Sequence, residues 1–263
     1  MTIGVLIENV SHPFSAALHR AVSEEAGARG VQVLVGSLDG DRERLLAAAL
    51  AGWRTDGLIL APTAIDQGHL SGFVGPVVFV DRGPAGVAGD MIVSTNVAGA
   101  AAATRHLIAQ GHRRIAYLGD LRRLTTARDR HRGYLRALGG RPGPVAHDLR
   151  DAAAAERATI AMLRAPDPPT AIFAARHVIT IGAVRALRRL GRQHEVALVG
   201  FDDFPLADLL DPPVTVVAQD PARIGRTAAT TLFERLNGDN GPPREIRIPT
   251  TLIPRGSGEI IAV

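Results

Sequence analysis

Polar and aromatic side chains gather in loops that directly follow short apolar segments of the chain. Their types suit the recognition of hydroxyl groups: carboxylates accept hydrogen bonds, a guanidinium donates a planar fork of them, and an aromatic ring covers the apolar face of a sugar. This chemistry predicts a pocket for a small molecule rich in hydroxyl groups. The candidate ligand-binding residues are Phe14, Ser15, Asp81, Arg130, Arg176, Asp202 and Gln219.

Several of these residues also have a purely structural interpretation, which the sequence leaves open. Aspartates often cap helices, and charged residues at helical spacing often form a solvated face. The alternatives are a cap on a short helix near Pro205 for Asp202 and Asp203, a solvated helix face for Arg128, Arg130 and Arg132, a core position for Phe14, and backbone pairing for Gln219.

The sequence lacks the motifs of the common catalytic, nucleotide and metal sites. No GxGxxG or GxxxxGK[ST] motif follows an apolar segment, and there is no GxSxG motif. The nine histidines occur singly, without metal-ligand spacing, and the absence of cysteine excludes thiolate zinc sites and cysteine nucleophiles. Asp, Arg and His in a cleft could host hydrolysis, but no nucleophile–base pair is evident. We therefore expect no enzymatic activity, no cofactor and no metal.

The composition is typical of a compact globular protein, and we expect a cytoplasmic location. Of the 263 residues, 46% are hydrophobic and 21% charged, which is enough for a sizeable core. All 30 basic residues are arginines, but they are scattered among 26 acidic residues, which argues against a nucleic-acid surface. The first residues have no basic leader, no apolar run is long enough for a membrane span, and the lack of cysteine fits a reducing compartment.

Short apolar runs alternate with amphipathic segments along the whole chain. Runs such as Ile3–Ile7 predict buried strands, whereas Asp41–Trp53 and Ala222–Leu236 have helical spacing. This alternation predicts parallel sheets covered by helices on both faces, with ligands bound at the carboxyl ends of the strands. About ten strands are many for one open sheet, so we expect two lobes. The pattern restarts near Thr95, where we place the break.

The order and spacing of these segments resemble the lactose-repressor family (LacI/GalR type) along nearly the whole chain. The resemblance implies an α/β fold similar to the type I periplasmic binding proteins, in which two Rossmann-like lobes with parallel sheets are joined by three crossovers. We expect an N-terminal lobe of residues 1–94 and 220–243 and a C-terminal lobe of residues 95–219 and 244–263. The similar segments are IGVLIENVSHPF (Ile3–Phe14), DGLILAP (Asp56–Pro62), VVFVDR (Val77–Arg82), HLIAQGHRRIAYLG (His106–Gly119), TARDRHRGYLRAL (Thr126–Leu138), PTAIFAA (Pro169–Ala175) and ALVGFDDFPLADLLDPPVTVVAQD (Ala197–Asp220).

The resemblance also implies a function. A sugar or sugar derivative would bind in the cleft between the lobes and control operator binding by the intact homodimer. Operator DNA would be bound only through a helix-turn-helix headpiece, whereas this chain starts directly on its first predicted strand. The alternative is the solute-binding protein of a sugar transporter, which shares the fold. By position, the family's effector contacts fall on Phe14, Ser15, Asp81, Arg130, Asp202 and Gln219.

One departure from the family bears on the ligand. After the segment FAA the family usually has Asn-Asp, but this chain has Arg176 and His177. Arginine keeps its charge and prefers carboxylate or phosphate acceptors, so Arg176 favours an anionic effector such as a sugar acid or sugar phosphate. The alternative is an internal ion pair in which Asp81 or Asp202 offsets the charge.

Overall fold

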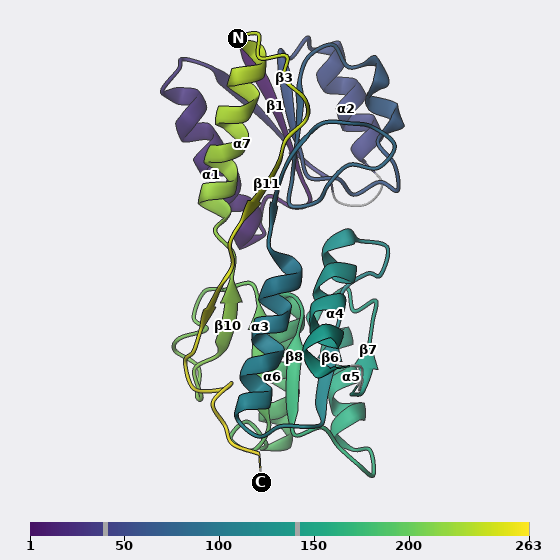
Figure 1. Ribbon diagram of the computed structural model, residues 1–263, viewed down its shortest axis with the longest axis vertical. Coiled ribbons are helices and arrows are strands. Elements are labelled where there is room, and N and C mark those ends of the chain that lie inside the picture. Colours follow the sequence, from purple (N-terminus) through teal and green to yellow (C-terminus); the bar gives the residue numbers. More distant parts are fainter. Residues whose placement is uncertain (39–41, 140–142, 263) are drawn as a thin grey trace. The chain divides into compact units, whose positions relative to one another are not determined.

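The computed structural model describes residues 1–38, 42–139 and 143–262, which form two α/β units. Unit 1 consists of Met1–Ser94 and Asp220–Pro249, and unit 2 of Thr95–Gln219 and Thr250–Val263. The chain therefore passes between the units after residues 94, 219 and 249, and each unit is built from separate pieces of sequence (Figure 1). The predicted fold class is confirmed.

Each unit is a sheet with helices on both faces. Unit 1 contains the strands β1 (Thr2–Ile7), β2 (Gln32–Ser37), β3 (Gly57–Leu60), β4 (Val77–Val80), β5 (Asp90–Ser94) and β11 (Glu245–Ile248), the helices α1 (Pro13–Gly27), α2 (Glu43–Gly52) and α7 (Pro221–Leu236), and the 3-10 helix η1 (Gly68–Gly72). Unit 2 contains the strands β6 (Ile115–Leu118), β7 (Val145–Ala146), β8 (Ala171–Ala174), β9 (Ala197–Phe201), β10 (Thr215–Ala218) and β12 (Thr251–Ile253) and the helices α3 (Asn96–Ala109), α4 (Thr125–Leu138), α5 (Ala152–Leu163) and α6 (His177–Leu190).

The two sheets repeat one topology. Within the described residues, the strand order is β11-β5-β4-β3-β1-β2 in unit 1 and β12-β10-β9-β8-β6-β7 in unit 2. All described pairings are parallel except that of β10 with β12. The strand order reverses between β1 and β3 in unit 1 and between β6 and β8 in unit 2. Such reversals are switch points, where open α/β sheets bind ligands at the carboxyl ends of their strands.

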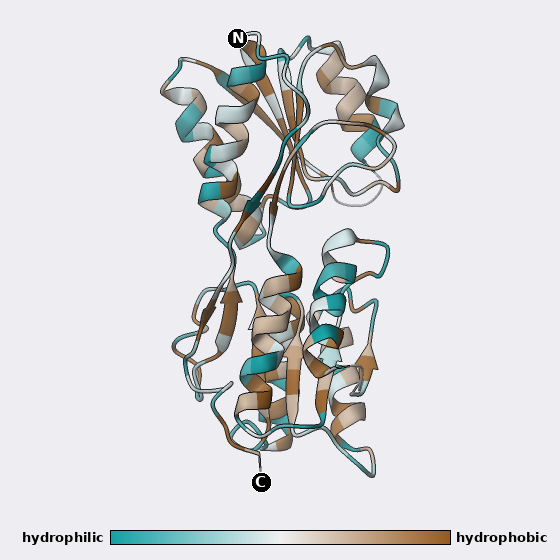
Figure 2. Cartoon of the chain, viewed as in Figure 1, coloured by the Kyte–Doolittle hydropathy of each residue, from teal (hydrophilic) through white to brown (hydrophobic). Residues whose placement is uncertain are grey.

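The strands are nearly continuous apolar runs because helices cover both of their faces. In β6, β8 and β9 every residue is buried. Figure 2 shows the strands of both units largely in tan and brown, whereas the helices also carry many hydrophilic residues. This pattern explains why the strands could be recognised in the sequence from short apolar runs.

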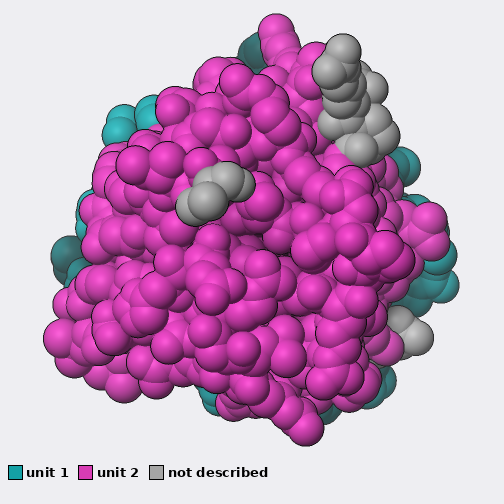
Figure 3. All heavy atoms as spheres, turned by 90° about the horizontal axis from the view of Figure 1, so that it is seen from below, with its two compact units in different colours: residues 1–94, 220–249 teal, residues 95–219, 250–263 magenta. Residues whose placement is uncertain are grey.

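The boundary between the units differs in one place from the sequence-based expectation. Figure 3 draws the two units in different colours and shows mainly unit 2. Residues 244–249 were expected in the C-terminal lobe, but they belong to unit 1. The reason is that β11 pairs in parallel with β5, from Glu245 opposite Met91 to Ile248 opposite Ser94. The predicted helix Asp41–Trp53 corresponds to α2, and Asp41 itself lies outside the described residues.

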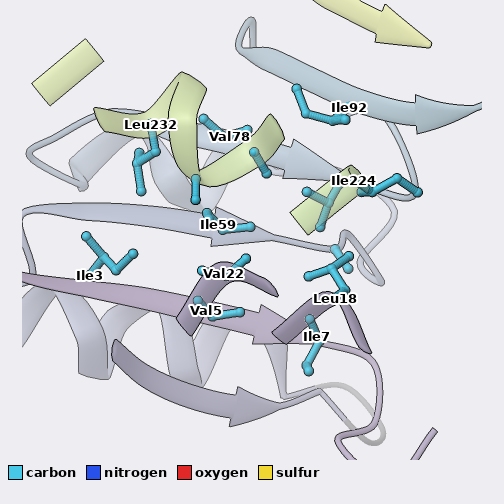
Figure 4. Close-up of a cluster of buried hydrophobic side chains, with 14 of the residues drawn as sticks. Ile3, Val5, Ile7, Leu18, Val22, Ile59, Val78, Ile92, Ile224 and Leu232 are labelled. Carbon is cyan, nitrogen blue, oxygen red and sulfur yellow. The ribbon is translucent and has the colours of Figure 1, made fainter. Parts of the chain in front are cut away.

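The two faces of each sheet pack into separate hydrophobic clusters. In unit 1, alternate residues of β1 such as Ile3 and Val5 pack against α1 and α7, as Figure 4 shows with Leu18 and Ile224. Leu6 points to the other face and packs with residues of α2. Unit 2 repeats this arrangement, with α3 and α4 on one face and α5 and α6 on the other. The helices on both faces therefore fix the positions of the strand ends and of the loops that follow them.

Three helix pairs among the described residues pack through a glycine. These glycines are Gly133 between α3 and α4, Gly182 between α5 and α6, and Gly225 between α1 and α7. A Cβ atom at any of them would lie less than 3.0 Å from a backbone carbonyl oxygen of the neighbouring helix. Backbone cannot move aside as a flexible side chain can, so any larger residue forces the helices apart.

We predict that Gly182→Ala lowers the free energy of unfolding by about 2 kcal/mol, because its methyl group would meet the Ala152 carbonyl oxygen of α5. Gly27→Ala is the matched control, since an added Cβ there meets nothing within 4 Å. The control should be neutral or stabilise by up to about 1 kcal/mol. Urea unfolding followed by circular dichroism measures both, and equal stabilities would contradict the prediction.

Candidate ligand-binding site

Four neighbouring strands of unit 2 end in polar side chains. Gln219 follows β10, Asp202 follows β9, Arg176 follows β8 and Asp120 follows β6. These strands are adjacent and parallel, so their carboxyl ends meet at one edge of the sheet. We call the four residues together with Arg130 the unit 2 edge.

Arg130 is the centre of the unit 2 edge. It lies on α4 and is buried, with only 6% of its surface exposed. Its Nε donates to the Asn96 side-chain oxygen at 2.8 Å, and its guanidinium also donates to the Ala175 carbonyl oxygen at 2.8 Å and to Asp202 at 3.4 Å. The guanidinium carbon lies 3.9 Å from the centre of the Phe201 ring. Arg130 is therefore not part of a solvated helix face, whereas its neighbours Arg128 and Arg132 are exposed.

Asp202 is held from several sides. It is buried and has a left-handed backbone with φ 72°, and its N–H donates to the Val217 carbonyl oxygen. One carboxylate oxygen accepts from Gln219 Nε2 at 2.6 Å, and the other faces Arg130. The alternative that Asp202 and Asp203 cap a short helix near Pro205 is wrong, because residues 205–209 form turns and not a helix. Gln219 pairs with a side chain, not with the backbone as the alternative supposed.

Arg176 and Asp120 form an ion pair at the switch point of unit 2. Arg176 precedes the first turn of α6, and its guanidinium donates to Asp120 at 3.0 Å. The other oxygen of the buried Asp120 accepts from the Leu121 N–H at 2.7 Å. The sequence suggested Asp81 or Asp202 as the residue that offsets the charge of Arg176, but its partner in unit 2 is Asp120. The positive charge is therefore already balanced within the protein.

The predicted residues of unit 1 lie near the carboxyl edge of its own sheet. Phe14, in the first turn of α1, is partly buried and packs against the unit 1 core, and the next residue, Ser15, is buried. Asp81 follows β4 in a left-handed conformation with φ 64°, and its carboxylate lies 3.3 Å from Arg82 Nε. Phe14 thus packs against the core, as the core alternative proposed, but it is not fully buried.

Three residues that contribute to the unit 2 edge were missed in the sequence. Asn96 orients Arg130, Asp120 balances Arg176, and Phe201 lies under the Arg130 guanidinium. Asp120 had a usable signal, since it follows a predicted strand in the same way as Asp202 does. Asn96 and Phe201 had none, because their roles depend on contacts with residues more than thirty positions away.

Within residues 1–38, 42–139 and 143–262, no three His, Asp or Glu side chains are grouped so as to hold a metal ion. Among the helices of those same segments, none combines the length and apolar character that crossing a lipid bilayer requires.

We predict that Asp202→Ala lowers the free energy of unfolding by about 3 kcal/mol, because it leaves the buried Arg130 without its carboxylate partner. The control is Asp203→Ala. Arg255 lies 2.6 Å from Asp203 and lowers the pKa of that carboxyl by hydrogen bonding, but the carboxylate is much more exposed. This control should therefore cost about 1 kcal/mol or less. Equal losses in chemical denaturation would show that burial at Asp202 does not matter.

The sequence and fold match known proteins along nearly the whole chain. A family model described as a periplasmic binding protein-like domain matches residues 104–258. The transcriptional regulator PtxS of Pseudomonas aeruginosa is 32% identical over 263 residues, which cover 97% of this chain and 77% of PtxS. PtxS is one of several relatives that are transcriptional regulators or repressors.

Solved structures of transcriptional regulators have the same fold as this chain. The complex of the transcriptional regulator CelR with cellobiose has a TM-score of 0.88 and 30% identity, covering 97% of this chain and 84% of CelR. A LacI family transcriptional regulator from Mycobacterium smegmatis has a TM-score of 0.86 and 27% identity, covering 97% and 98% of the two chains. The chain belongs to the LacI family of transcriptional regulators and has the fold of their effector-binding domain.

Proposed function

We propose that the unit 2 edge binds an uncharged, sugar-like effector and that this binding controls operator DNA binding by the intact cytoplasmic regulator. The observation that carries the proposal is the charge balance of the edge. Arg130 is paired with Asp202 and Arg176 with Asp120, so the four charged groups sum to zero. A neutral ligand then meets carboxylate acceptors and guanidinium donors at fixed positions without adding a charge.

The relatives support a sugar as the ligand class. CelR, which shares 30% of its residues with this chain, has been solved with cellobiose. Asp202 is the strongest candidate for contacting a ligand hydroxyl, because its carboxylate is already oriented by Gln219 and Arg130. We propose that Phe14, Ser15 and Asp81 of unit 1 contribute further contacts, as their positions in the sequence imply.

An anionic effector is the second candidate, and the exposure of Arg176 is what favours it. The Arg176 side chain is 16% exposed, more than twice as much as that of Arg130 at 7%. A sugar acid or sugar phosphate could therefore compete with Asp120 for the Arg176 guanidinium. The two candidates differ in what Arg176 does: it shapes the site for a neutral ligand and contacts an anionic one.

We predict that neutral sugars such as cellobiose or ribose raise the melting temperature of the wild type, because a ligand that binds only the folded state stabilises it. Asp202→Asn should abolish this shift, since losing a charged hydrogen bond to a ligand costs about 2–5 kcal/mol. Asp203→Asn is the matched control and should retain the shift. Arg176→Asn should also keep the response to neutral sugars.

The same thermal-shift screen includes gluconate and glucose 6-phosphate. If only these anions stabilised the wild type, and Arg176→Asn removed their effect, the effector would be anionic. If Asp202→Asn and Asp203→Asn responded equally to an active sugar, the unit 2 edge would not be the binding site.

We also propose that the protein is a homodimer that pairs through unit 2. The resemblance to the LacI family implies pairing through segments that contain Ile181 and Leu210, and both residues are partly buried. The turn of residues 205–209, which follows β9, carries two more exposed leucines, with Leu206 65% and Leu209 74% exposed. Neighbouring exposed leucines are typical of an interaction surface.

We predict that the wild type sediments as a dimer and that Leu209→Glu raises the dimer dissociation constant at least about tenfold, because each copy would place a charge in an apolar contact. Ile261→Glu is a control at another exposed apolar residue and should leave the dimer intact. A wild type that sediments as a monomer at every concentration would refute the proposal.

A further inference from the structure

A second polar surface of unit 2 lies on the side of α4 that faces away from the unit 2 edge. Arg128, Arg132 and Arg136 are spaced four residues apart on α4, so they share one helix face, and all three are exposed. Arg130 is two residues from Arg128 and from Arg132 and therefore points to the opposite side of the helix. The site already proposed does not use this arginine face.

The arginine face borders a groove of about 780 Å³. His147, just after the edge strand β7, lies across from α4, and Arg122 precedes α4 in the chain; Figure 1 shows α4 and β7 next to one another. A volume of this size accommodates a small organic molecule. The groove is lined by Arg122, Ala127, Arg128, His131, Arg132, Leu135, Arg136 and His147.

Two imidazole rings, supported by buried tyrosines, form part of the groove wall. The rings of His131 and His147 lie edge to face with their centres 4.6 Å apart, and Tyr117 of β6 lies 4.8 Å from His131. The His131 Nε2 atom is buried and has no hydrogen-bond partner among the described residues. Burial lowers the pKa of both imidazoles, and their mutual repulsion lowers that of His131 further.

The charges at the groove do not cancel. Asp148 pairs with Arg122 and Asp129 with Arg132, which neutralises two of the four arginines. Arg128 donates to the backbone carbonyl oxygen of Arg123, and Arg136 has neither a carboxylate nor a hydrogen-bond partner in the described chain. Two guanidinium charges therefore remain, next to a buried imidazole nitrogen that lacks a partner. The unit 2 edge, in contrast, is electrically balanced.

We propose that this groove is a second ligand site of the regulator, which binds a small phosphate-bearing molecule with at least two negative charges. Guanidinium groups match phosphate oxygens in geometry and charge, and an imidazole N–H adds a further donor. Leu135 and the flat imidazole rings offer an apolar surface beside the phosphate position. An organic phosphate uses both surfaces, whereas an inorganic polyphosphate uses only the charges.

The test uses two probes, pyrophosphate and phenyl phosphate, with phenol as the uncharged control. Their binding to the full chain is measured by calorimetry at about 150 mM salt, where long-range attraction is screened. Binding should shift the imidazole ¹⁵N resonances of His131 and His147. Arg136→Gln should weaken binding about tenfold, because one charge-assisted hydrogen bond is lost. Arg136 is exposed, so this variant should fold normally.

Arg157→Gln is the matched control, since Arg157 is an exposed arginine of α5 in the same unit. It should change the affinity by less than about twofold, because the charge it removes is distant and screened. Tighter binding of phenyl phosphate would identify an organic phosphate as the ligand, and tighter binding of pyrophosphate an inorganic one; both results support the site.

Three results would overturn the proposal. The first is the absence of any shift of the two histidine resonances with either probe. The second is equal weakening in Arg136→Gln and Arg157→Gln, which would mean that the arginines act only through overall charge. The third is loss of phosphate binding in Arg176→Asn, which would place the phosphate at the unit 2 edge. None of these results depends on whether that edge binds a neutral sugar.

Discussion

The unit 2 edge depends on one buried guanidinium. Removing the charge of Arg130 from water costs several kcal/mol, and this cost is offset only because a carboxylate, an amide oxygen, a backbone carbonyl and an aromatic ring all face it. Asn96 belongs to α3, Ala175 and Asp202 directly follow β8 and β9, and Phe201 is the last residue of β9. A residue with so many partners fixes the loops around it, so Asp202 is held in position before any ligand arrives.

Unit 1 contains a comparable arrangement. Arg82, which follows β4, donates to Glu8 at 2.6 Å and to the Pro62 carbonyl oxygen at 3.1 Å, and so spans the ends of β1 and β3. In unit 2 the ion pair of Arg176 with Asp120 spans the ends of β8 and β6. In both sheets an arginine therefore bridges the point where the strand order reverses. At such a point the loops that follow the two strands diverge, and the arginine links them.

The sequence predicted the elements much better than it predicted the partners within the site. Buried parallel strands have a strong local signal, and polar residues placed directly after them, such as Asp202 and Arg176, must come to the same edge. The partners are set by side-chain direction and by distant segments, as for Asn96 and Arg130, and local spacing contains no information about them. The assignment of residues 244–249 failed for a related reason, because the pairing of β11 with β5 joins segments about 150 residues apart.

The glycines at the helix crossings have an evolutionary consequence. Because Gly133, Gly182 and Gly225 bring backbones into direct contact, the spacing of these helices does not depend on how larger side chains interlock. Substitutions in the loops after the strands then leave the helix frame unchanged. A replacement such as Arg-His for Asn-Asp after β8 can thus change the side chains at the unit 2 edge while the helix spacing stays the same. Such a scaffold can acquire new ligands by single steps, each of which leaves a folded protein.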